Sequence, residues 1–330
     1  MSERFMTSAD DYETLIRKRL PSWLAQRLGE PEIRIVSATR LAGGFSNETW
    51  NIQCEYGPAG ALQSIEFILR WSPEGSLYYP SDIPGQFALL ESLGQTSIPA
   101  PAPLWLELDA DVLGEPFLTM KLVPGSTGPR VFPLDDPQRH EKLEEYVRAL
   151  TDIHALDWRQ FGLSSVLDEP TTESCARDAL DIVIDRVTSR GVADNPVAKR
   201  TIAWLSARIP ESSEVTLIHG DPNLSNYRFC GTSVVGILDW DLARLSDPMW
   251  DVGFVCGALA KFFVDEPPKV QQSETQRFLD LYEDASGRSV ENLEFWQGLY
   301  TLRAAASSSH PAMRSNQSSV YWNLLELLDA

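Results

Sequence analysis

Cysteine and histidine are scarce in this sequence. The four cysteines, Cys54, Cys175, Cys230 and Cys256, are far apart in the chain, and they form no C-x-x-C pair. Because only four histidines are present to complete a ligand set, a structural zinc site is disfavoured. We therefore predict reduced thiols in a cytoplasmic protein.

Basic residues are outnumbered, and no long apolar run occurs. The chain has 28 lysines and arginines against 47 acidic residues, a formal net charge of −19. Such a field repels nucleic-acid phosphates and anionic lipid headgroups. The most apolar stretch, residues 252–264, contains Lys261 and is too short to span a bilayer, and residues 1–15 lack the features of a signal peptide. We expect neither nucleic-acid nor membrane partners.

What the sequence does contain is the composition of a globular protein with two parts. Its 330 residues exceed the length at which one core usually keeps growing. Strands are predicted for five segments: 33–40, 49–54, 65–71, 104–108 and 116–123. A helix is predicted at 83–93, and one or two helices at 9–28, with Pro21 in a first turn. After Pro124 the pattern predicts helices, apart from a hairpin within 217–240. We predict an α+β fold with a small antiparallel-sheet domain, 1–123, and a mostly helical domain, 124–330.

The strongest chemical signal is His219-Gly220-Asp221 followed by Asn226, which matches H-x-D-x-x-x-x-N in spacing and residue type. In phosphoryl transfer, the aspartate of such a set accepts the proton of the attacking hydroxyl, and the asparagine oxygen binds magnesium. Asp239 offers a second metal-binding carboxylate. Each residue singly is also common in tight loops, but the full set at this spacing favours a phosphate and metal site.

The hairpin is expected to bring the two metal-binding groups together. If Thr232 and Ser233 are its central turn residues, Asn226 and Asp239 are equidistant from the turn and lie opposite each other. Two hard oxygen ligands in that position suit Mg²⁺.

These segments resemble the aminoglycoside phosphotransferase and choline kinase-like family. The resemblance is carried by residues 217–226 (LIHGDPNLSN), by 236–241 (GILDWD) and by the aspartates at 247 and 251. It implies a two-lobed protein-kinase-like fold, ATP as phosphate donor, Asp221 as catalytic base, and Asn226 and Asp239 as Mg²⁺ ligands. Asp247 and Asp251 match positions that brace loops in the family, and Asp241 is undecided between loop support and substrate contact.

A glycine-containing segment, residues 42–47 (AGGFSN), lies between two predicted strands. Glycines there would let backbone N–H groups approach an anion closely, although an ordinary hairpin turn has the same composition. The segment is similar to the glycine loop of the family. The resemblance implies phosphate contacts from Gly43, Gly44, Ser46 and Asn47.

The next element departs from the kinase pattern. Kinases place a lysine on the third strand and pair it with a helix glutamate, whereas this chain has Arg70 and, at the aligned helix position, Gln86. Arginine can bind phosphate through two parallel hydrogen bonds, so we predict a phosphate role for Arg70, with a solvated strand-end charge as the alternative. Asp82 or Glu91 could replace Gln86 as its partner.

Residues 116–125 would form the last strand of the first domain and its connector, and they include Lys121, Leu122 and Val123. In the resembling family the backbone of this connector holds adenine, although an apolar strand before a Pro-Gly turn suits any domain junction. His154 lies on an apolar helical face, which favours a hydrogen-bonded core histidine over a catalytic one.

The acceptor is expected to be a small molecule with a hydroxyl group. Residues 211–330 contain 17 acidic and 8 basic residues, an excess that would attract a cation or simply keep the surface soluble. Aromatic residues would suit a cation–π cage, an apolar substrate or helix packing; they are Phe295, Trp296, Tyr300, Tyr321 and Trp322. The runner-up function is a nucleotide-binding protein with weak or no turnover. The acceptor, the choice of ATP or GTP, and the oligomeric state stay open.

Overall fold

The computed structural model describes residues 9–41, 47–58, 60–74, 76, 81–263 and 265–309. The described residues form two compact units, one within Met1–Glu91 and Pro101–Val123 and the other within Ser92–Ala100 and Pro124–Ala330. None of the helices in these described ranges is long and apolar enough to cross a membrane. The predicted α+β class is confirmed.

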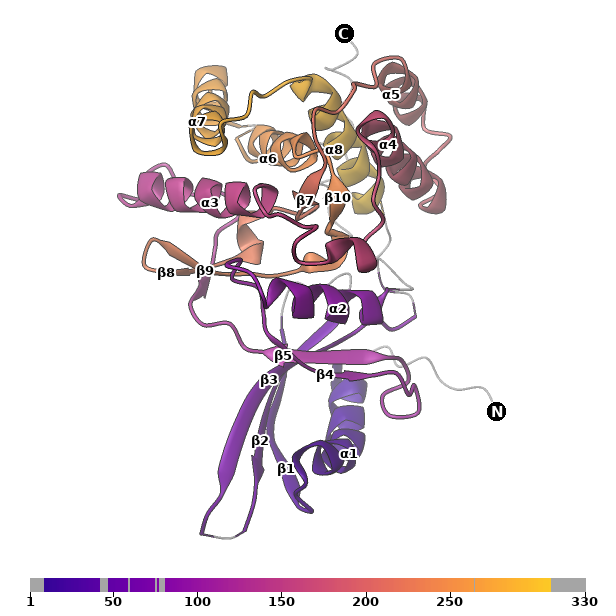
Figure 1. Cartoon of the computed structure of the whole chain (residues 1–330), viewed down its shortest axis with the longest axis vertical. Helices are drawn as coiled ribbons and strands as arrows, with labels where there is room; N and C mark the ends of the chain where they lie inside the picture. Colours follow the sequence, from indigo (N-terminus) through magenta and orange to yellow (C-terminus); the bar gives the residue numbers. More distant parts are fainter. Residues whose placement is uncertain are drawn as a thin grey trace. The chain divides into compact units, whose positions relative to one another are not determined.

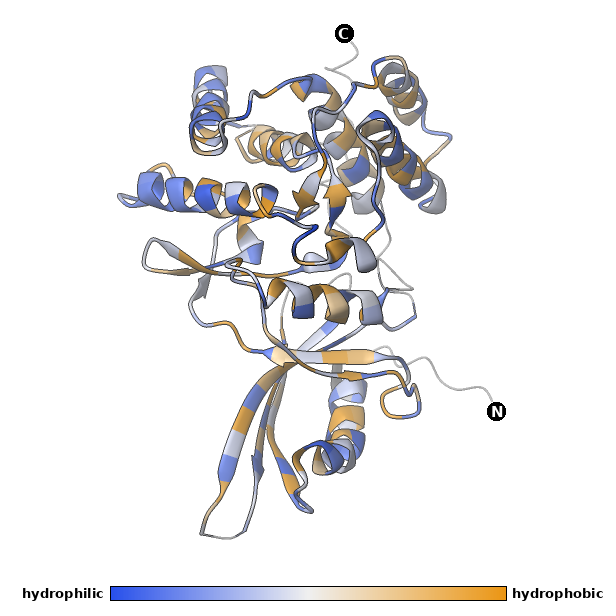
Figure 2. Ribbon diagram, viewed as in Figure 1, coloured by the Kyte–Doolittle hydropathy of each residue, from blue (hydrophilic) through white to orange (hydrophobic). Residues whose placement is uncertain are grey.

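The first unit is built on a five-stranded antiparallel sheet with strand order β1-β2-β3-β5-β4. Along β2, the buried residues recur at every second position from Glu48 to Cys54, which is the period of a strand with one face on a core. Figure 2 shows apolar and polar residues alternating along parts of β1, β2 and β3. The strands are β1 (Ile33–Arg40), β2 (Glu48–Tyr56), β3 (Gln63–Trp71), β4 (Pro103–Glu107) and β5 (Phe117–Lys121).

Helix α1 (Ala9–Leu28) packs against β1 as one continuous helix (Figure 1). The expected first-turn position of Pro21 is therefore wrong, because Pro21 lies inside the helix. A proline there removes a backbone hydrogen bond, but its neighbours Leu20 and Leu24 are fully buried in the core of this unit. Burial of that apolar face supplies most of the stability of such a helix, which outweighs the lost bond.

The second unit is mostly helical and holds two small sheets. The three-stranded sheet has the order β6-β8-β9, and β7 pairs with β10. Its strands are β6 (Ser126–Thr127), β7 (Thr216–Ile218), β8 (Tyr227–Cys230), β9 (Ser233–Ile237) and β10 (Arg244–Ser246). Its helices are α3 (Arg139–His154), α4 (Thr172–Ser189), α5 (Pro196–Ser206), α6 (Met249–Phe262), α7 (Pro268–Ser286) and α8 (Leu293–Ser308). The remaining helix, α2 (Ile83–Leu93), lies between β3 and β4 in the chain.

Helices α6 and α8 lie side by side (Figure 1). Their close approach depends on Gly253, where an added Cβ would come within 2.6 Å of the backbone carbon of Trp296. The facing residues of α8, including Trp296 and Leu299, are buried. This contact fixes the first turn of α6, which carries Asp251.

The hairpin differs from the prediction in three ways. The segment 217–218 is not part of it, because β7 pairs with β10 instead. Cys230 pairs with Ser233, so Gly231 and Thr232 are the central turn residues, and a bulge then shifts the pairing between Arg228 and Phe229. The expected turn centre at residues 232–233 is therefore wrong by one residue. The bulge is a third difference, because it adds an unpaired residue within the strands that spacing alone does not reveal.

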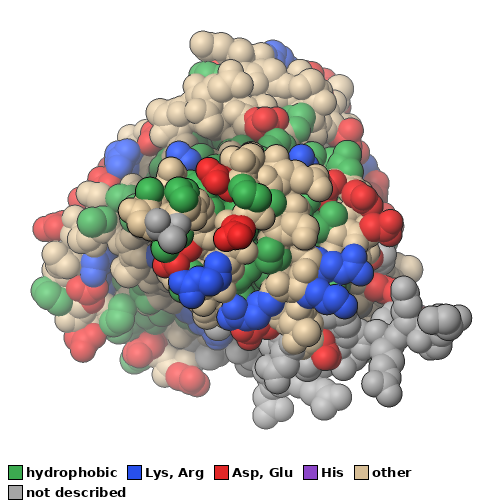
Figure 3. All heavy atoms as spheres, turned by 90° about the horizontal axis from the view of Figure 1, so that it is seen from below, with side chains coloured by type: hydrophobic (Ala, Val, Ile, Leu, Met, Phe, Trp, Pro, Cys, Tyr) green, Lys and Arg blue, Asp and Glu red, His purple; other side chains and the backbone are tan. Residues whose placement is uncertain are grey.

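Charged side chains of both signs are interspersed on the molecular face shown in Figure 3. Basic side chains gather in part of this face, with acidic and apolar side chains between them. The net charge of −19 is therefore not a uniform acidic coat, and it does not by itself identify a cationic ligand.

Candidate functional site

Asp221 lies just after β7, and two asparagines of the following loop donate hydrogen bonds to it. The side-chain amide of Asn223 donates to Asp221 Oδ1 at 2.6 Å. The amide of Asn226, at the end of a short 3₁₀ turn before β8, donates to the backbone oxygen of Asp221 at 2.9 Å. Asn223 was not singled out from the sequence, because asparagine in a Pro-Asn turn is unremarkable there.

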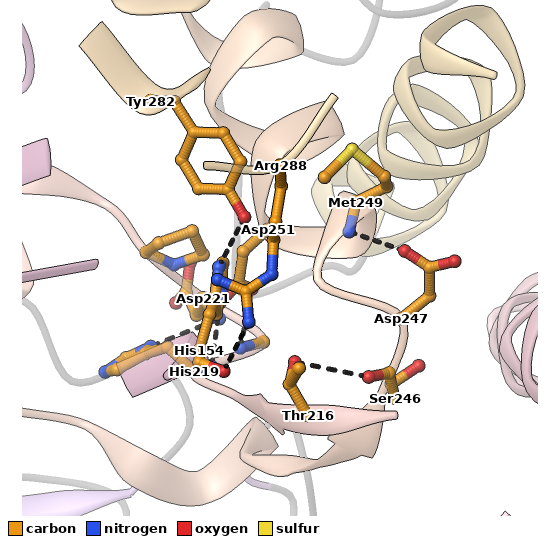
Figure 4. A network of polar contacts seen from close by, with 12 residues as sticks. His154, Thr216, His219, Asp221, Ser246, Asp247, Met249, Asp251, Tyr282 and Arg288 are labelled. Carbon is orange, nitrogen blue, oxygen red and sulfur yellow. Dashed lines mark hydrogen bonds and ion pairs between the residues drawn. The ribbon is translucent and has the colours of Figure 1, made fainter. Parts of the chain in front are cut away.

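Asp251, in the first turn of α6, braces the same loop. Its two carboxylate oxygens accept the backbone N–H groups of His219 at 2.8 Å and Gly220 at 2.9 Å. The Asp251 side chain is fully buried. Figure 4 shows this network, which joins α6 to the loop that carries Asp221. The bracing role expected of Asp251 is therefore visible in the geometry.

His154, from α3, belongs to this network and has the predicted core position. Its Nε2 lies 3.2 Å from Asp251 Oδ2, and its Nδ1 lies 2.9 Å from the Tyr282 hydroxyl (Figure 4). Both ring nitrogens have partners and the residue is buried. In the neutral form, Nε2–H donates to the carboxylate and Nδ1 accepts from Tyr282. The interpretation of His154 as a hydrogen-bonded core histidine is confirmed.

His219 and Gly220 give the loop its shape. His219 Nε2 donates to the backbone oxygen of Leu238 at 2.9 Å, and its Nδ1 accepts the backbone N–H of Asp221. Burial lowers the pKa of His219, which favours the neutral ring that this pattern requires. Gly220 has φ 77°, and an added Cβ would sit 2.1 Å from the backbone oxygen of Leu242. Only glycine fits that position.

Asp239 follows β9 and has a left-handed backbone, with φ 66°. Leu238 N donates to Asn226 O at 2.7 Å, so Asn226 is opposite Leu238 rather than opposite Asp239 as expected. Because of the positive φ, side chains no longer alternate between the two faces of the strand at Asp239. The Asp239 carboxylate is nevertheless near enough to contribute to the raised pKa of Asp221, after the larger effect of burial. Asp221, Asn226 and Asp239 therefore gather at one end of the hairpin.

Arg303, on α8, is a site residue that the sequence reasoning missed. Its Nη1 donates to the backbone oxygen of Gly220 at 2.9 Å, across 83 residues of chain. Its guanidinium lies over the Phe254 ring, 5.1 Å from the centroid. No motif connects it to residue 221. The available signal was a single basic residue in a mostly buried helix, where an unpaired charge would be costly.

The electrostatics of Asp221 combine opposing effects. Burial raises the pKa of Asp221 to about 6, the Arg303 charge opposes this rise, and the Asp239 charge adds to it. The hydrogen bond from Asn223 to the carboxylate also favours the ionised form. A carboxylate with this pKa is ionised at neutral pH. Because the pKa is close to neutral pH, the carboxylate can also accept a proton.

The oxygen donors fit a small divalent cation. The Asn226 amide nitrogen is held toward Asp221, so its Oδ1 points away and is the atom left for a cation. Asp239 supplies a carboxylate, and hard oxygen donors suit Mg²⁺. In the described part of the chain no cluster of three or more His, Cys, Asp or Glu could hold a metal. A set of two protein oxygen donors fits Mg²⁺, which keeps waters and phosphate oxygens in its shell, better than an ion bound by protein groups alone.

The remaining expected site residues belong to the first unit or lie outside the described residues. Gly43, Gly44 and Ser46 are in the latter group. Asn47 is buried, and its Oδ1 accepts the Ser81 hydroxyl at 3.2 Å. Lys121, Leu122 and Val123 end β5 and follow it, with Lys121 and Leu122 exposed.

Arg70 lies near the end of β3, paired with Thr49 and Leu118. It is 8% exposed, so the alternative of a solvated strand-end charge is wrong. Of its expected partners, Asp82 caps α2 by accepting the backbone N–H of Gly85 at 2.9 Å, and Glu91 is exposed. The pairing of Arg70 with Gln86, Asp82 or Glu91 stays a prediction.

The aromatic residues of α8 pack between helices. Phe295, Trp296 and Tyr300 are buried, and the Tyr300 ring lies 4.3 Å from the Phe254 ring. Of the three interpretations left open for them, helix packing is the one that the structure supports. Tyr321 and Trp322 lie outside the described residues.

Comparison with known proteins adds a family and a fold. The model of the phosphotransferase enzyme family (APH) matches residues 37–292. A region covering 72% of this chain is 27% identical to acyl-CoA dehydrogenase family member 10 of Mus musculus, but it makes up only 22% of that protein's length.

Two solved structures show the same architecture. A candidate aminoglycoside phosphotransferase from Ralstonia eutropha JMP134 is 19% identical, with a TM-score of 0.67, over 94% of this chain and 95% of the other. A thermostable mutant of aminoglycoside phosphotransferase APH(4)-Ia, in a ternary complex with ADP and hygromycin B, is 14% identical, with a TM-score of 0.64, over 94% and 97%. These likenesses confirm the predicted kinase-like phosphotransferase fold.

Proposed function

Because this chain belongs to the phosphotransferase enzyme family, we propose that it is a small-molecule phosphotransferase that uses ATP and Mg²⁺ to phosphorylate a hydroxyl group. The observation that carries the proposal is the Asp221 carboxylate, held by Asn223 and flanked by Asn226, Asp239 and Arg303. The ADP complex of a structural neighbour supports a nucleotide as phosphate donor. We also propose that the protein is cytoplasmic.

Asp221 acts as the base in this proposal. The acceptor oxygen forms a bond to the γ-phosphorus of ATP, the bond from that phosphorus to the bridging oxygen breaks, and ADP leaves with the bonding electrons. The acceptor proton passes to an Asp221 carboxylate oxygen. Asn223, donating to Oδ1 at 2.6 Å, orients the carboxylate and leaves Oδ2 for the proton. Asp251 keeps the loop in place through Gly220 and His219.

Asn226 Oδ1 and the Asp239 carboxylate are the groups that would hold Mg²⁺. When bound, this ion neutralises charge on the β- and γ-phosphates. The left-handed backbone of Asp239 is a strained conformation of the kind that collects at functional sites, where the surrounding structure has to maintain it.

The first unit is proposed to hold the nucleotide. Arg70 would bind phosphate oxygens, because a buried guanidinium remains charged and forms two parallel hydrogen bonds. Asn47 and the neighbouring Gly43, Gly44 and Ser46 would cover the phosphates, and the backbone of Lys121, Leu122 and Val123 would contact adenine. The domain division proposed for these roles is 1–123 and 124–330.

Transfer of radiolabelled γ-phosphate from ATP to a panel of acceptors tests the proposal. The panel contains choline, an aminoglycoside, a macrolide and hydroxyacyl compounds, the last because the mouse relative is named as an acyl-CoA dehydrogenase. We expect transfer to at least one acceptor, and loss of transfer when EDTA removes Mg²⁺. ATP binding without transfer to any acceptor class would instead favour the runner-up, a nucleotide-binding protein without turnover.

Arg303 provides a test of the electrostatics. Replacing Arg303 with Met keeps apolar contact with Phe254 but removes the charge that opposes the raised pKa of Asp221. The acid limb of the pH profile of turnover, set by ionisation of Asp221, is therefore expected to move to higher pH. Arg303→Lys keeps the charge and should leave the limb near its original position. An unmoved limb in Arg303→Met would show that Arg303 acts on packing alone.

A further inference from the structure

A cavity of about 40 Å³ lies within the second unit, beside the loop that carries Asp221. This is space for about three water molecules or a short alkyl group. Its walls come from α3, α6, α7 and residues 130–132 and 222–224. Most of the lining is apolar and aromatic, including Phe132, Leu143, Phe254, Leu259, Phe262 and Phe278.

The cavity is connected to the proposed base through the residues that follow Asp221 in the same loop. Pro222 and Asn223 form part of its wall, and Asn223 donates to Asp221 Oδ1 at 2.6 Å. Tyr146, another wall residue, is buried and donates its hydroxyl to the backbone oxygen of Pro222 at 2.6 Å. The wall is therefore rigidly tied to the residue that holds the carboxylate, which is the arrangement that a substrate subsite needs.

The charges around the cavity do not suit a cation. Among its described lining residues the charged ones are Arg130, Arg139 and Glu274. Glu274 is the sole carboxylate in that set, and it is ion-paired with Arg139, with both side chains 14% exposed. An ammonium group entering here would find no available carboxylate and would lose its hydration. An apolar group would gain the transfer free energy of burial.

We propose that this cavity is an acceptor subsite that receives a small alkyl or aryl group of the alcohol to be phosphorylated. The inference rests on the proposed function and narrows it, because it selects acceptors with an apolar group over polycationic sugars and quaternary amines. Phe254 links the two parts of the site, since it lines the cavity and also lies under the Arg303 guanidinium.

A homologous series of primary n-alkanols tests the subsite in the wild-type protein. We expect kcat/KM to rise about fourfold for each added methylene group until the cavity is filled, which is the usual gain from burying that group. Amino alcohols of the same length should be poorer acceptors than the alkanols. A kcat/KM that does not depend on chain length would overturn the proposal.

Two variants of α6 form a matched pair. Ala258 lines the cavity and Ala260 does not, although both are half-buried on the same helix. Ala258→Phe should fill the cavity and raise KM at least tenfold for longer alkanols, while leaving the shortest unaffected, and Ala260→Phe should change neither. Phe262→Ala enlarges the cavity and should move the preferred chain to a greater length. Equal effects of the two alanine variants would contradict the subsite.

Calorimetric binding of butan-1-ol separates this inference from the proposed function. If no acceptor is phosphorylated but butan-1-ol binds saturably to wild type and not to Ala258→Phe, the proposed function fails and the subsite stands. If phosphoryl transfer occurs but butan-1-ol neither binds nor competes with the acceptor, the subsite fails and the proposed function stands.

Discussion

Asp221→Asn is expected to abolish measurable phosphoryl transfer while making the folded protein more stable above pH 6. Asparagine keeps the shape of the side chain but cannot accept the acceptor proton, and removing a general base typically costs about 10²- to 10⁴-fold in rate. Activity and stability therefore move in opposite directions, as they do where a functional group is held in an unfavourable environment.

The pH dependence of the stability gain follows from the pKa of Asp221. Burial raises that pKa to about 6, so the fold favours the protonated acid. The stabilisation of the folded protein by protonated Asp221 is complete at pH values below the pKa of this group in the unfolded chain. It is lost as the pH rises through about 6. Above that pH the wild type holds an ionised carboxylate at a cost of about 1–3 kcal/mol, reduced by the partial solvent contact of the side chain. Asparagine is uncharged throughout.

Urea unfolding of both proteins at pH 5 and pH 8 measures this gain. The difference in free energy of unfolding should be larger at pH 8 than at pH 5. Asp265→Asn, which changes an exposed carboxylate, should show no such difference and serves as the control. A variant that retains wild-type transfer would exclude Asp221 as the base, and an identical stability difference at the two pH values would contradict the raised pKa.

Asp251→Ala is expected to be the most destabilising single substitution around the site. The fully buried carboxylate accepts the backbone N–H groups of His219 and Gly220 and contacts His154. Alanine leaves these buried groups without an acceptor, at about 1–3 kcal/mol each. We expect a loss of about 3–5 kcal/mol, which lowers Tm by about 10 °C for a unit of this size.

A graded series checks the origin of the effect. Asp251→Asn keeps one acceptor oxygen and should lose less than the alanine variant. Asp247→Ala removes a buried carboxylate that accepts the backbone N–H of Met249 at 2.7 Å, and should cost about 1 kcal/mol, as for a helix-start bond. Differential scanning calorimetry gives Tm for all three. Equal Tm values for Asp251→Ala and Asp247→Ala would show that the hydrogen bonds of Asp251 stabilise the fold no more than the hydrogen bond of Asp247 does.

The spacing of residues in the sequence was enough to locate the part of the site at the end of the hairpin, but not enough to predict its strand pairing. His219, Asp221, Asn226 and Asp239 are close together in the chain, so their spacing in the sequence is enough to indicate that they lie near one another. The pairing register did not follow, because the turn is centred on Gly231 and Thr232 and a bulge then shifts the pairing by one residue between Arg228 and Phe229. The same limit applies to Pro21, whose place inside α1 depends on how the helix packs on its sheet.

The sequence by itself determined the family, the α+β class, most strand and helix positions, and the set of residues that can carry phosphate chemistry. These follow from local periodicity and from motifs that are contiguous in the chain. Only the tertiary structure decided that Arg303 reaches Gly220 and that Asp251 holds the loop. It also decided that an apolar cavity adjoins Asn223. These contacts join residues dozens of positions apart, so they depend on how helices pack, which no local pattern encodes.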